Sequence, residues 1–306
     1  MFQVFARTKG HRPTLWAATN NDGQILALLL PVQIALSDGV LRRLTTRAVV
    51  YGSVLFAPNP AGQEALVTLL RTYVHEADHE ALFTELRNLS DLKAVQPVLS
   101  DCGFVYEDHL NYLIDLDRPI EAIMQSIGKR TRKKIRRQLR QDEVTIEEVT
   151  HREQIAPWYA VLRQTYNRAQ VPLAAPSLFE AAFDILYPRG RIKFLAARVG
   201  QAYAAVSAEL LYKDVVYGWY GGMDRAYSNF YPNELVTWHM LQWGTEQGYK
   251  VYDFGGAGKP DEEYHVRDFK AKFGGELVCY GRNTRVHAPF LLRLSRLGYK
   301  IFHRLV

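Results

Sequence analysis

The chain has 306 residues, 48% hydrophobic and 12% aromatic, a composition that excludes an intrinsically disordered protein and can form one large core or two modest ones. Its two cysteines, Cys102 and Cys279, lie far apart in the sequence, which argues against a disulfide framework or a cysteine-rich zinc site and favours a reducing cytoplasm. The net charge of +6 is local: eight Lys and Arg residues lie at 129–140 and six at 282–306, while the rest of the chain, with 32 acidic residues, is net negative.

The first half of the chain predicts alternating strands and helices. Runs rich in apolar and β-branched residues predict strands at 15–19, 25–36, 48–56, 83–86 and 104–116. Helical spacing of apolar residues predicts helices at 65–79 and 92–100. The run 25–36 is the longest apolar stretch, but Pro31 and Gln33 interrupt it and a membrane span needs roughly 20 residues. We therefore expect a buried strand there, and we find no signal-peptide pattern at the start of the chain.

The first predicted helix ends in a possible metal motif. His75-Glu76-Ala77-Asp78-His79 fits H-E-x-x-H, in which two histidines on one helix face bind zinc. The motif lies where the helix is expected to end, and no third histidine follows at the spacing of the extended zinc-protease motif. We interpret it as a chance occurrence and predict no metal site.

A basic helix is predicted at 129–140. Its apolar seam is narrow, formed by Ile127, Ile135 and Leu139, and its other faces carry Arg and Lys. Such a helix suits phosphate groups, either of tRNA or of a diphosphate-linked substrate. A solvated helix face without a ligand is the alternative.

The second half of the chain repeats the alternation without a readable sequence repeat. Strands are predicted at 144–149, 192–198, 202–211, 215–220, 249–254 and 277–280. Helices are predicted at 154–169, 178–186, 234–247 and around Phe269.

The most informative stretch runs from Asp253 to Gly275. A strand ending in Asp-Phe-Gly is followed by a glycine-rich turn, the pair Phe269-Lys270 and a final Phe-Gly-Gly. This pattern resembles the FemAB/FemX family of peptidoglycan-bridge aminoacyltransferases. The segments 128–139, 228–238 and 10–13 are similar to further parts of that family, so the resemblance covers nearly the whole chain.

The resemblance implies an α+β fold with two acetyltransferase-like (GNAT-type) domains flanking a cleft. The expected domains are 1–141, to which 282–306 returns, and 142–281. The long coiled-coil arm of some family members is missing here. The chain also begins at a point where the family usually has a preceding helix and strand, so we expect a trimmed first domain or a late start.

The activity that the resemblance implies is transfer of an aminoacyl group from aminoacyl-tRNA to an amine of a peptidoglycan precursor peptide, nucleotide- or lipid-linked, without a cofactor. Lys270 would stabilise the oxyanion of the transition state, and Asp253 or Asp268 would accept the proton. The expected substrate-binding residues are Phe269, Gly255, Gly256, Tyr217, Tyr220, Arg132, Lys133 and Arg136. The enzyme would lie in the cytoplasm, at the inner face of the membrane if its acceptor is lipid-linked.

Two other functions remain open. An N-acyltransferase of the same fold could use acyl-CoA on a sugar or peptide amine, but the glycine-rich pyrophosphate turn of such enzymes has no good match, since the segment 198–203 has the wrong spacing and lies between two predicted strands. A non-catalytic RNA-binding module is the third reading.

The C-terminal segment predicts an amphipathic helix. Its apolar stripe contains Phe290, Leu294, Leu297 and Ile301, and its basic edge contains Arg293, Arg296, Lys300 and Arg304. Peripheral binding to an anionic membrane and docking on the first domain are the two interpretations.

Overall fold

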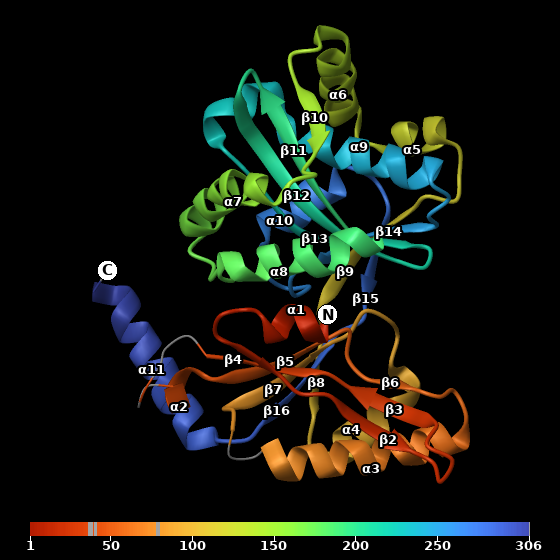
Figure 1. Cartoon of the computed structure of the whole chain (residues 1–306), viewed down its shortest axis with the longest axis vertical. Coiled ribbons are helices and arrows are strands. Elements are labelled where there is room, and N and C mark those ends of the chain that lie inside the picture. Colours follow the sequence, from red (N-terminus) through yellow and green to blue (C-terminus); the bar gives the residue numbers. More distant parts are fainter. Residues whose placement is uncertain (36–38, 40–41, 78–79, 306) are drawn as a thin grey trace. The chain divides into compact units, whose positions relative to one another are not determined.

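The computed structural model describes residues 1–35, 39, 42–77 and 80–305, with the side chains of the last helix described up to 295 and at 297 and 298. The chain forms two compact units, one of Met1–His109 with Tyr280–Val306 and one of Leu110–Cys279 (Figure 1). Within the part of the chain that is described, no helix has both the length and the apolar character needed to cross a bilayer.

The first unit contains two sheets. The six-stranded sheet has the order β1 (His11–Pro13), β4 (Pro31–Ile34), β5 (Arg47–Tyr51), β7 (Phe83–Arg87), β16 (Arg282–Val286) and β8 (Val105–Glu107). The three-stranded sheet is formed by β2 (Trp16–Thr19), β3 (Ile25–Leu29) and β6 (Leu55–Phe56). The helices are α1 (Phe2–Ala6), α2 (Arg42–Thr45), α3 (Pro60–Ala77), a 3₁₀ turn at Lys93–Val95, α4 (Gln96–Asp101) and α11 (Pro289–Leu305).

The core of the first unit forms around α3. The buried side chains of this helix recur at helical spacing and include Leu66, Leu70 and Tyr73. They pack with buried residues of both sheets, among them Leu29 and Leu86. A long helix between the parallel strands β5 and β7 is the connection that parallel pairing requires.

The second unit is built on one seven-stranded sheet. Its order is β10 (Thr145–Glu148), β11 (Ile192–Val199), β12 (Ala202–Tyr212), β13 (Val215–Met223), β14 (Val251–Gly256), β9 (Leu110–Asp115) and β15 (Glu276–Cys279). The helices are α5 (Ile120–Ser126), α6 (Lys129–Gln141), α7 (Ile155–Ala169), α8 (Pro176–Leu186), α9 (Pro232–Glu246) and α10 (His265–Ala271), with 3₁₀ turns at Arg152–Gln154, Tyr187–Arg189 and Arg225–Phe230.

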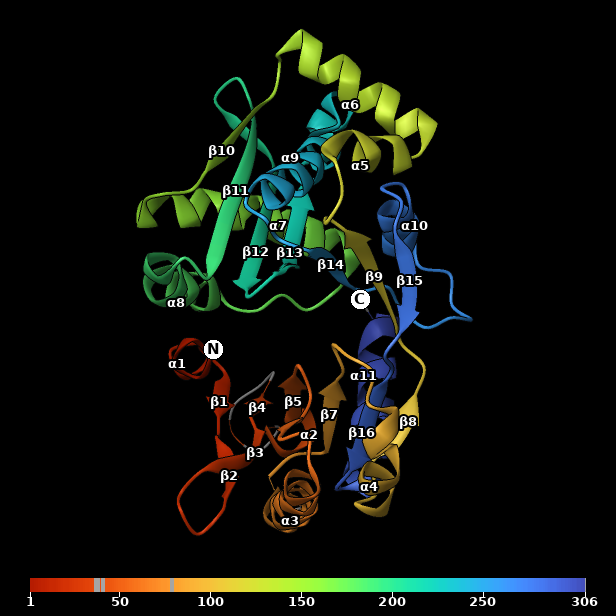
Figure 2. The same cartoon turned by 90° about the vertical axis from the view of Figure 1, so that its right-hand side faces the viewer.

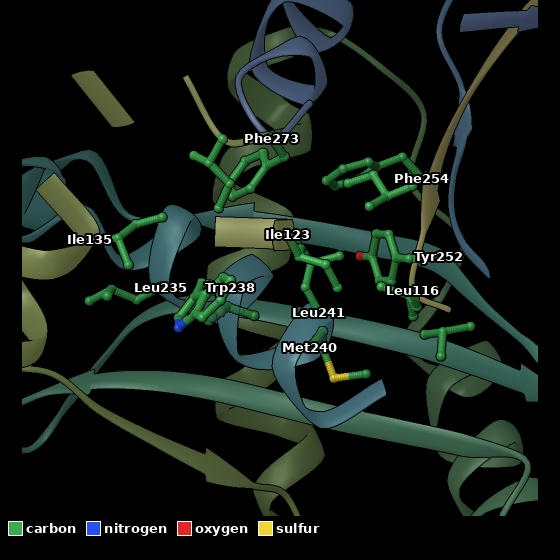
Figure 3. Packing of buried hydrophobic residues seen from close by; sticks show 14 of the residues in the cluster. Leu116, Ile123, Ile135, Leu235, Trp238, Met240, Leu241, Tyr252, Phe254 and Phe273 are labelled. Carbon is green, nitrogen blue, oxygen red and sulfur yellow. The ribbon is translucent and has the colours of Figure 1, made fainter. Parts of the chain in front are cut away.

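Helices cover both faces of this sheet (Figure 2). On the face of α7 and α8, the ring of Trp158 lies 5.2 Å from that of Phe179 and 5.1 Å from that of Phe194, and its indole N–H donates to a strand carbonyl. On the opposite face, Trp238 and Leu241 of α9 pack in the cluster drawn in Figure 3. Each fully buried side chain of this size stabilises the fold by roughly 1.5–3 kcal/mol.

The boundary between the units differs from the sequence prediction. The prediction assigned residues up to 141 to the first domain, whereas the division falls between His109 and Leu110. The reason is packing: Ile123, Ile127 and Ile135 of the α5–α6 region belong to the same core cluster as the residues of α9. The second crossing of the chain falls between Cys279 and Tyr280, and the C-terminal segment clusters with the first unit.

Two long strands of the prediction are each divided. The run 25–36 becomes β3 and β4 in different sheets, with Pro31 at the start of β4, and residues 36–38 lie outside the described part of the chain. The run 104–116 becomes β8 in the first unit and β9 in the second. Apolar character continues across the first break, at Leu30, whereas the second falls at the polar residues Asp108 and His109, which the prediction treated as part of one strand.

Candidate active site

Strands β13 and β14 of the second unit part in the middle of the sheet. They run parallel and pair only from Val215 with Val251 to Tyr217 with Asp253. Strand β13 then continues to Met223 and β14 to Gly256, and the pairing of β14 with β9 is irregular between Asp253 and Gly256. Backbone groups at the end of β14 therefore need partners from outside the sheet ladder.

The side chain of Lys270, on α10, forms hydrogen bonds with these backbone groups. Its side chain is buried, and its ammonium nitrogen donates to the carbonyl oxygens of Phe254 at 2.6 Å, Gly255 at 3.3 Å and Gly256 at 2.7 Å. An ammonium group has three N–H donors, so these three carbonyls occupy all of them. The lysine expected to be catalytic thus also holds the shape of the strand end.

Burial shifts the pKa values of both Lys270 and Asp253 in favour of their neutral forms. Burial lowers the pKa of Lys270 to about 8, and attraction to Asp253 only partly opposes this. Burial likewise raises the pKa of Asp253, against the backbone N–H of Gly255 and the charge of Lys270. The carboxyl of Asp253 accepts from that N–H at 2.7 Å. The structure therefore brings two of the three expected catalytic residues together.

Asp268 and Phe269 lie elsewhere on α10. Asp268 is two residues from Lys270, on a different side of the helix, and its side chain is 74% exposed beside His265 at 3.7 Å. The ring of Phe269 is half-buried, 5.4 Å from that of Phe273, and packs against the core of the second unit. Phe269 thus has a packing role in this structure.

The expected tyrosines and glycines lie on the two parting strands. Gly255 has φ +69°, and a Cβ there would come within 3.0 Å of the hydroxyl of Tyr217. That close approach requires glycine. Tyr220 packs 4.9 Å from the ring of Phe179 and 5.9 Å from that of Tyr166, which places it against α7 and α8.

A fully buried carboxyl group near the parting strands was not predicted. Glu209 of β12 is 2% exposed, and the hydroxyl of Tyr252 donates to it at 3.3 Å. Burial raises the pKa of Glu209 to about 8, which the hydrogen bonds to its carboxyl only partly offset. Gly218 faces it across the strand pair, and a Cβ there would come within 3.4 Å of the carboxyl. A glutamate within an apolar strand was the available signal in the sequence.

The basic helix is α6, and its docked face differs from the predicted seam. Thr131, Ile135 and Gln138 are buried and face α9, whereas Leu139 is 56% exposed. The predicted seam is therefore wrong at Leu139, because the three buried positions lie closer to one another on the helix surface.

Most basic side chains of α6 face outward. Lys133 and Arg136 are exposed, and Arg132 is half-buried and donates to the carbonyl of Gln125 at 2.6 Å. Lys134 lies 4.1 Å from the ring centre of Tyr231, which precedes α9. No acidic residue occurs in this helix, so the exposed side of α6 is positively charged.

The H-E-x-x-H segment is only partly described. Helix α3 ends at Ala77, and Asp78 and His79 lie outside the described residues. The side chain of His75 is 87% exposed and lies 3.4 Å from Glu76. No cluster of three or more metal-binding side chains occurs among the residues whose positions are given.

The comparisons with known proteins agree with this geometry. Residues 126–271 match a family described as an acetyltransferase (GNAT) domain, a range that includes α6, the parting strands and Lys270. FemX covers 96% of the chain, and the chain covers 92% of FemX, with a TM-score of 0.71 at 16% sequence identity. The chain has a FemX-like fold. The resemblance seen in the sequence is confirmed at this level, and so is the expected pair of GNAT-type units.

Two further structures share the FemX-like fold. The C-terminal domain (DUF2156) of a candidate lysylphosphatidylglycerol synthetase from Agrobacterium fabrum has a TM-score of 0.62 and 15% identity, covering 97% of this chain and 90% of its own. A tandem GNAT protein from the clavulanic acid biosynthesis pathway has a TM-score of 0.57 and 11% identity, covering 92% and 85%. No curated protein sequence matches the chain. The domain match confirms the expected class, an acyltransferase or aminoacyltransferase.

Proposed function

We propose that the chain transfers an aminoacyl group from aminoacyl-tRNA to an amine of a peptidoglycan precursor peptide. The observation that carries this proposal is helix α6, which has eight basic and no acidic residues and belongs to the unit that matches the acetyltransferase domain. A long positive surface suits an RNA donor, whose many phosphates it can contact together. The FemX-like fold across both units supports the same assignment.

In the proposed reaction, the amine nitrogen attacks the ester carbonyl carbon and the bond from that carbon to the ribose oxygen breaks. The amine loses a proton and the ribose oxygen gains one, so the atoms balance. Lys270 would stabilise the oxyanion of the tetrahedral intermediate by exchanging one of its three carbonyl partners for the negative oxygen.

Asp253 is the better proton acceptor of the two candidates. It is buried next to the charge of Lys270, whereas Asp268 lies exposed beside His265. The amine is a good nucleophile and the ester is already activated, so a base of modest strength is sufficient. Arg132, Lys133 and Arg136 would contact tRNA phosphates, and no cofactor is required.

An acyl-CoA-dependent N-acyltransferase acting on a sugar or peptide amine is the second candidate. The match of residues 126–271 to an acetyltransferase domain and the tandem GNAT neighbour favour it. Against it, the segment 198–203 is the hairpin connection of β11 and β12 and does not precede a helix.

The deciding experiment compares both donors on the same acceptors. Labelled aminoacyl-tRNA and labelled acetyl-CoA are supplied separately with nucleotide-linked and lipid-linked precursor, and transfer of label to the peptide is measured. We expect transfer from aminoacyl-tRNA alone. Transfer from acetyl-CoA alone would establish the second candidate, and strong tRNA binding without transfer from either donor would leave an RNA-binding module.

A further inference from the structure

Helix α11 of the first unit has two apolar sides. Leu292 is 8% exposed, and the helix contacts the short helix α2, so one side is docked on the unit. Phe290, Leu294 and Leu297 are 75%, 46% and 56% exposed. At 100° per residue these three positions share one face, roughly opposite Leu292. Docking of the helix therefore leaves a second apolar face uncovered by described residues.

A basic residue of α11 borders this exposed face. Arg293 is exposed between Phe290 and Leu294 in the sequence. Helix α2, which α11 contacts, carries the exposed Arg43 (Figure 1). Neither arginine forms an ion pair with a described residue, and the segment 282–306 contains six Lys and Arg residues and no acid. Arg296, Lys300, Ile301 and Arg304 continue the predicted edge and stripe, but their side chains lie outside the described ones.

The occupant of this face must accept apolar side chains and positive charge together. A second copy of the chain is disfavoured, because it would bring the same arginines of both copies together without an acid between them. A membrane surface with anionic lipids fits both features, since acyl chains accept Phe and Leu while headgroups attract Arg.

We propose that α11 binds the surface of an anionic membrane, with Phe290, Leu294 and Leu297 inserted at the headgroup boundary and Arg293 against the lipid phosphates. A membrane-bound enzyme would meet a lipid-linked precursor at a raised local concentration. This inference therefore extends the proposed function toward a lipid-linked acceptor, but the binding itself does not depend on that function.

The test is co-sedimentation of the full chain with vesicles of phosphatidylcholine, pure or with roughly one third phosphatidylglycerol. We expect binding to the anionic vesicles only, weakening as salt rises. The variant Phe290→Ser/Leu294→Ser/Leu297→Ser should lower the partition coefficient at least tenfold. Reversal of Arg293 to Glu should lower it by more than the roughly fivefold expected for one lost charge.

The matched control is Leu55→Ser/Val105→Ser, which removes apolar side chains that are 62% and 70% exposed on strands β6 and β8 of the same unit. It should bind vesicles like the parent chain, and thermal melting should show all variants folded.

Three outcomes would overturn the inference: no binding to anionic vesicles, full binding by the triple serine variant, or a dimer in solution that this variant dissociates. Transfer to a nucleotide-linked precursor should be unchanged in the triple variant. Loss of vesicle binding and loss of the proposed activity are therefore separable.

Discussion

The ammonium group of Lys270 has a structural role and, in the proposed reaction, a catalytic one. Its three hydrogen bonds to backbone carbonyls shape the end of β14, and the proposed reaction also assigns it the charge of the acyl-transfer intermediate. With its pKa lowered to about 8, the side chain still carries its charge at neutral pH. An exchange of one carbonyl for an oxyanion would favour the charged form further.

Replacing Lys270 with Met should slow the chemical step by about 10²–10³-fold, because an oxyanion partner is lost. The unfolding free energy should change by no more than about 2 kcal/mol, since the lost hydrogen bonds and the removed cost of a buried charge oppose each other. Single-turnover rates at saturating substrates and denaturant unfolding are the measurements.

The control for this variant is Lys272→Met, at the residue that follows α10. Its side chain is 44% exposed, and its ammonium nitrogen lies 5.1 Å from the ring centre of Phe269. It should react within about threefold of the parent chain. If Lys270→Met also reacted within about threefold of the parent chain, Lys270 would have no part in the chemical step and its role would be purely structural.

Glu209 should make the stability of the second unit depend on pH. Because its pKa is raised to about 8 in the folded state, the folded chain holds a proton that the unfolded chain releases near its ordinary value of 4.5. Stability from this group is complete below 4.5 and falls as the pH rises toward 8.

Glu209→Gln should abolish that dependence. Relative to the variant, the parent chain should lose on the order of 2 kcal/mol of unfolding free energy between pH 5 and pH 7. Urea unfolding of both proteins across this range gives the answer. Parallel pH curves for the two proteins would mean that Glu209 does not hold its proton in the folded state.

At the scale of elements, helix α6 has a buried side without charged residues and an exposed side rich in Lys and Arg. Ile135 and its buried neighbours fix it against α9, and the outward side carries only basic and neutral residues. Because the docked side contains no charged residue, changes at Lys133 and Arg136 should leave the fold intact, and a change at Arg132 removes one hydrogen bond, to the carbonyl of Gln125.

Reversing Arg132, Lys133 and Arg136 together to Glu should weaken tRNA binding at least tenfold. The slope of log affinity against log salt should fall by about two to three, since each phosphate contact contributes roughly 0.7–0.9 to it. Filter binding over a range of salt concentrations measures both quantities.

The control reverses Arg163, Arg168 and Lys213, three exposed basic residues of the same unit, and changes the net charge equally. Its affinity and salt slope should stay near those of the parent chain. If both triple variants lost the same tRNA affinity, the effect would come from net charge in general and not from binding of tRNA by α6.

At the scale of the whole chain, the second unit is defined by contacts between distant segments. Strand β9 lies between β14 and β15 and pairs with both, and the region of α5 and α6 contributes Ile123, Ile127 and Ile135 to the core. A fragment that lacks these segments loses both sheet pairing and apolar burial.

The fragment 110–279 should therefore fold cooperatively when expressed alone, whereas 142–281 should not. The second fragment leaves β15 without its partner and exposes the core surface that α5 and α6 cover. Circular dichroism during thermal melting distinguishes them. A cooperative transition in 142–281 at the temperature of the longer fragment would contradict this division.

The sequence by itself determined the features that depend only on residues close together in the chain. The order of strands and helices, the basic character of α6 and the pattern around Phe269 and Lys270 could all be predicted, because helical spacing, strand alternation and turn residues act over a few positions. The FemX-like fold was predicted from the order of such motifs along the chain.

Only the tertiary structure decided what depends on distant residues. Apolar patterning did not show that 104–116 leaves one sheet for another, because both halves are equally suited to strands. The carbonyl partners of Lys270 lie 14–16 residues away, and the burial of Glu209 depends on Tyr252 of another strand. Pairing and burial across such separations arise from the packed chain as a whole, and local sequence patterns carry little information about them.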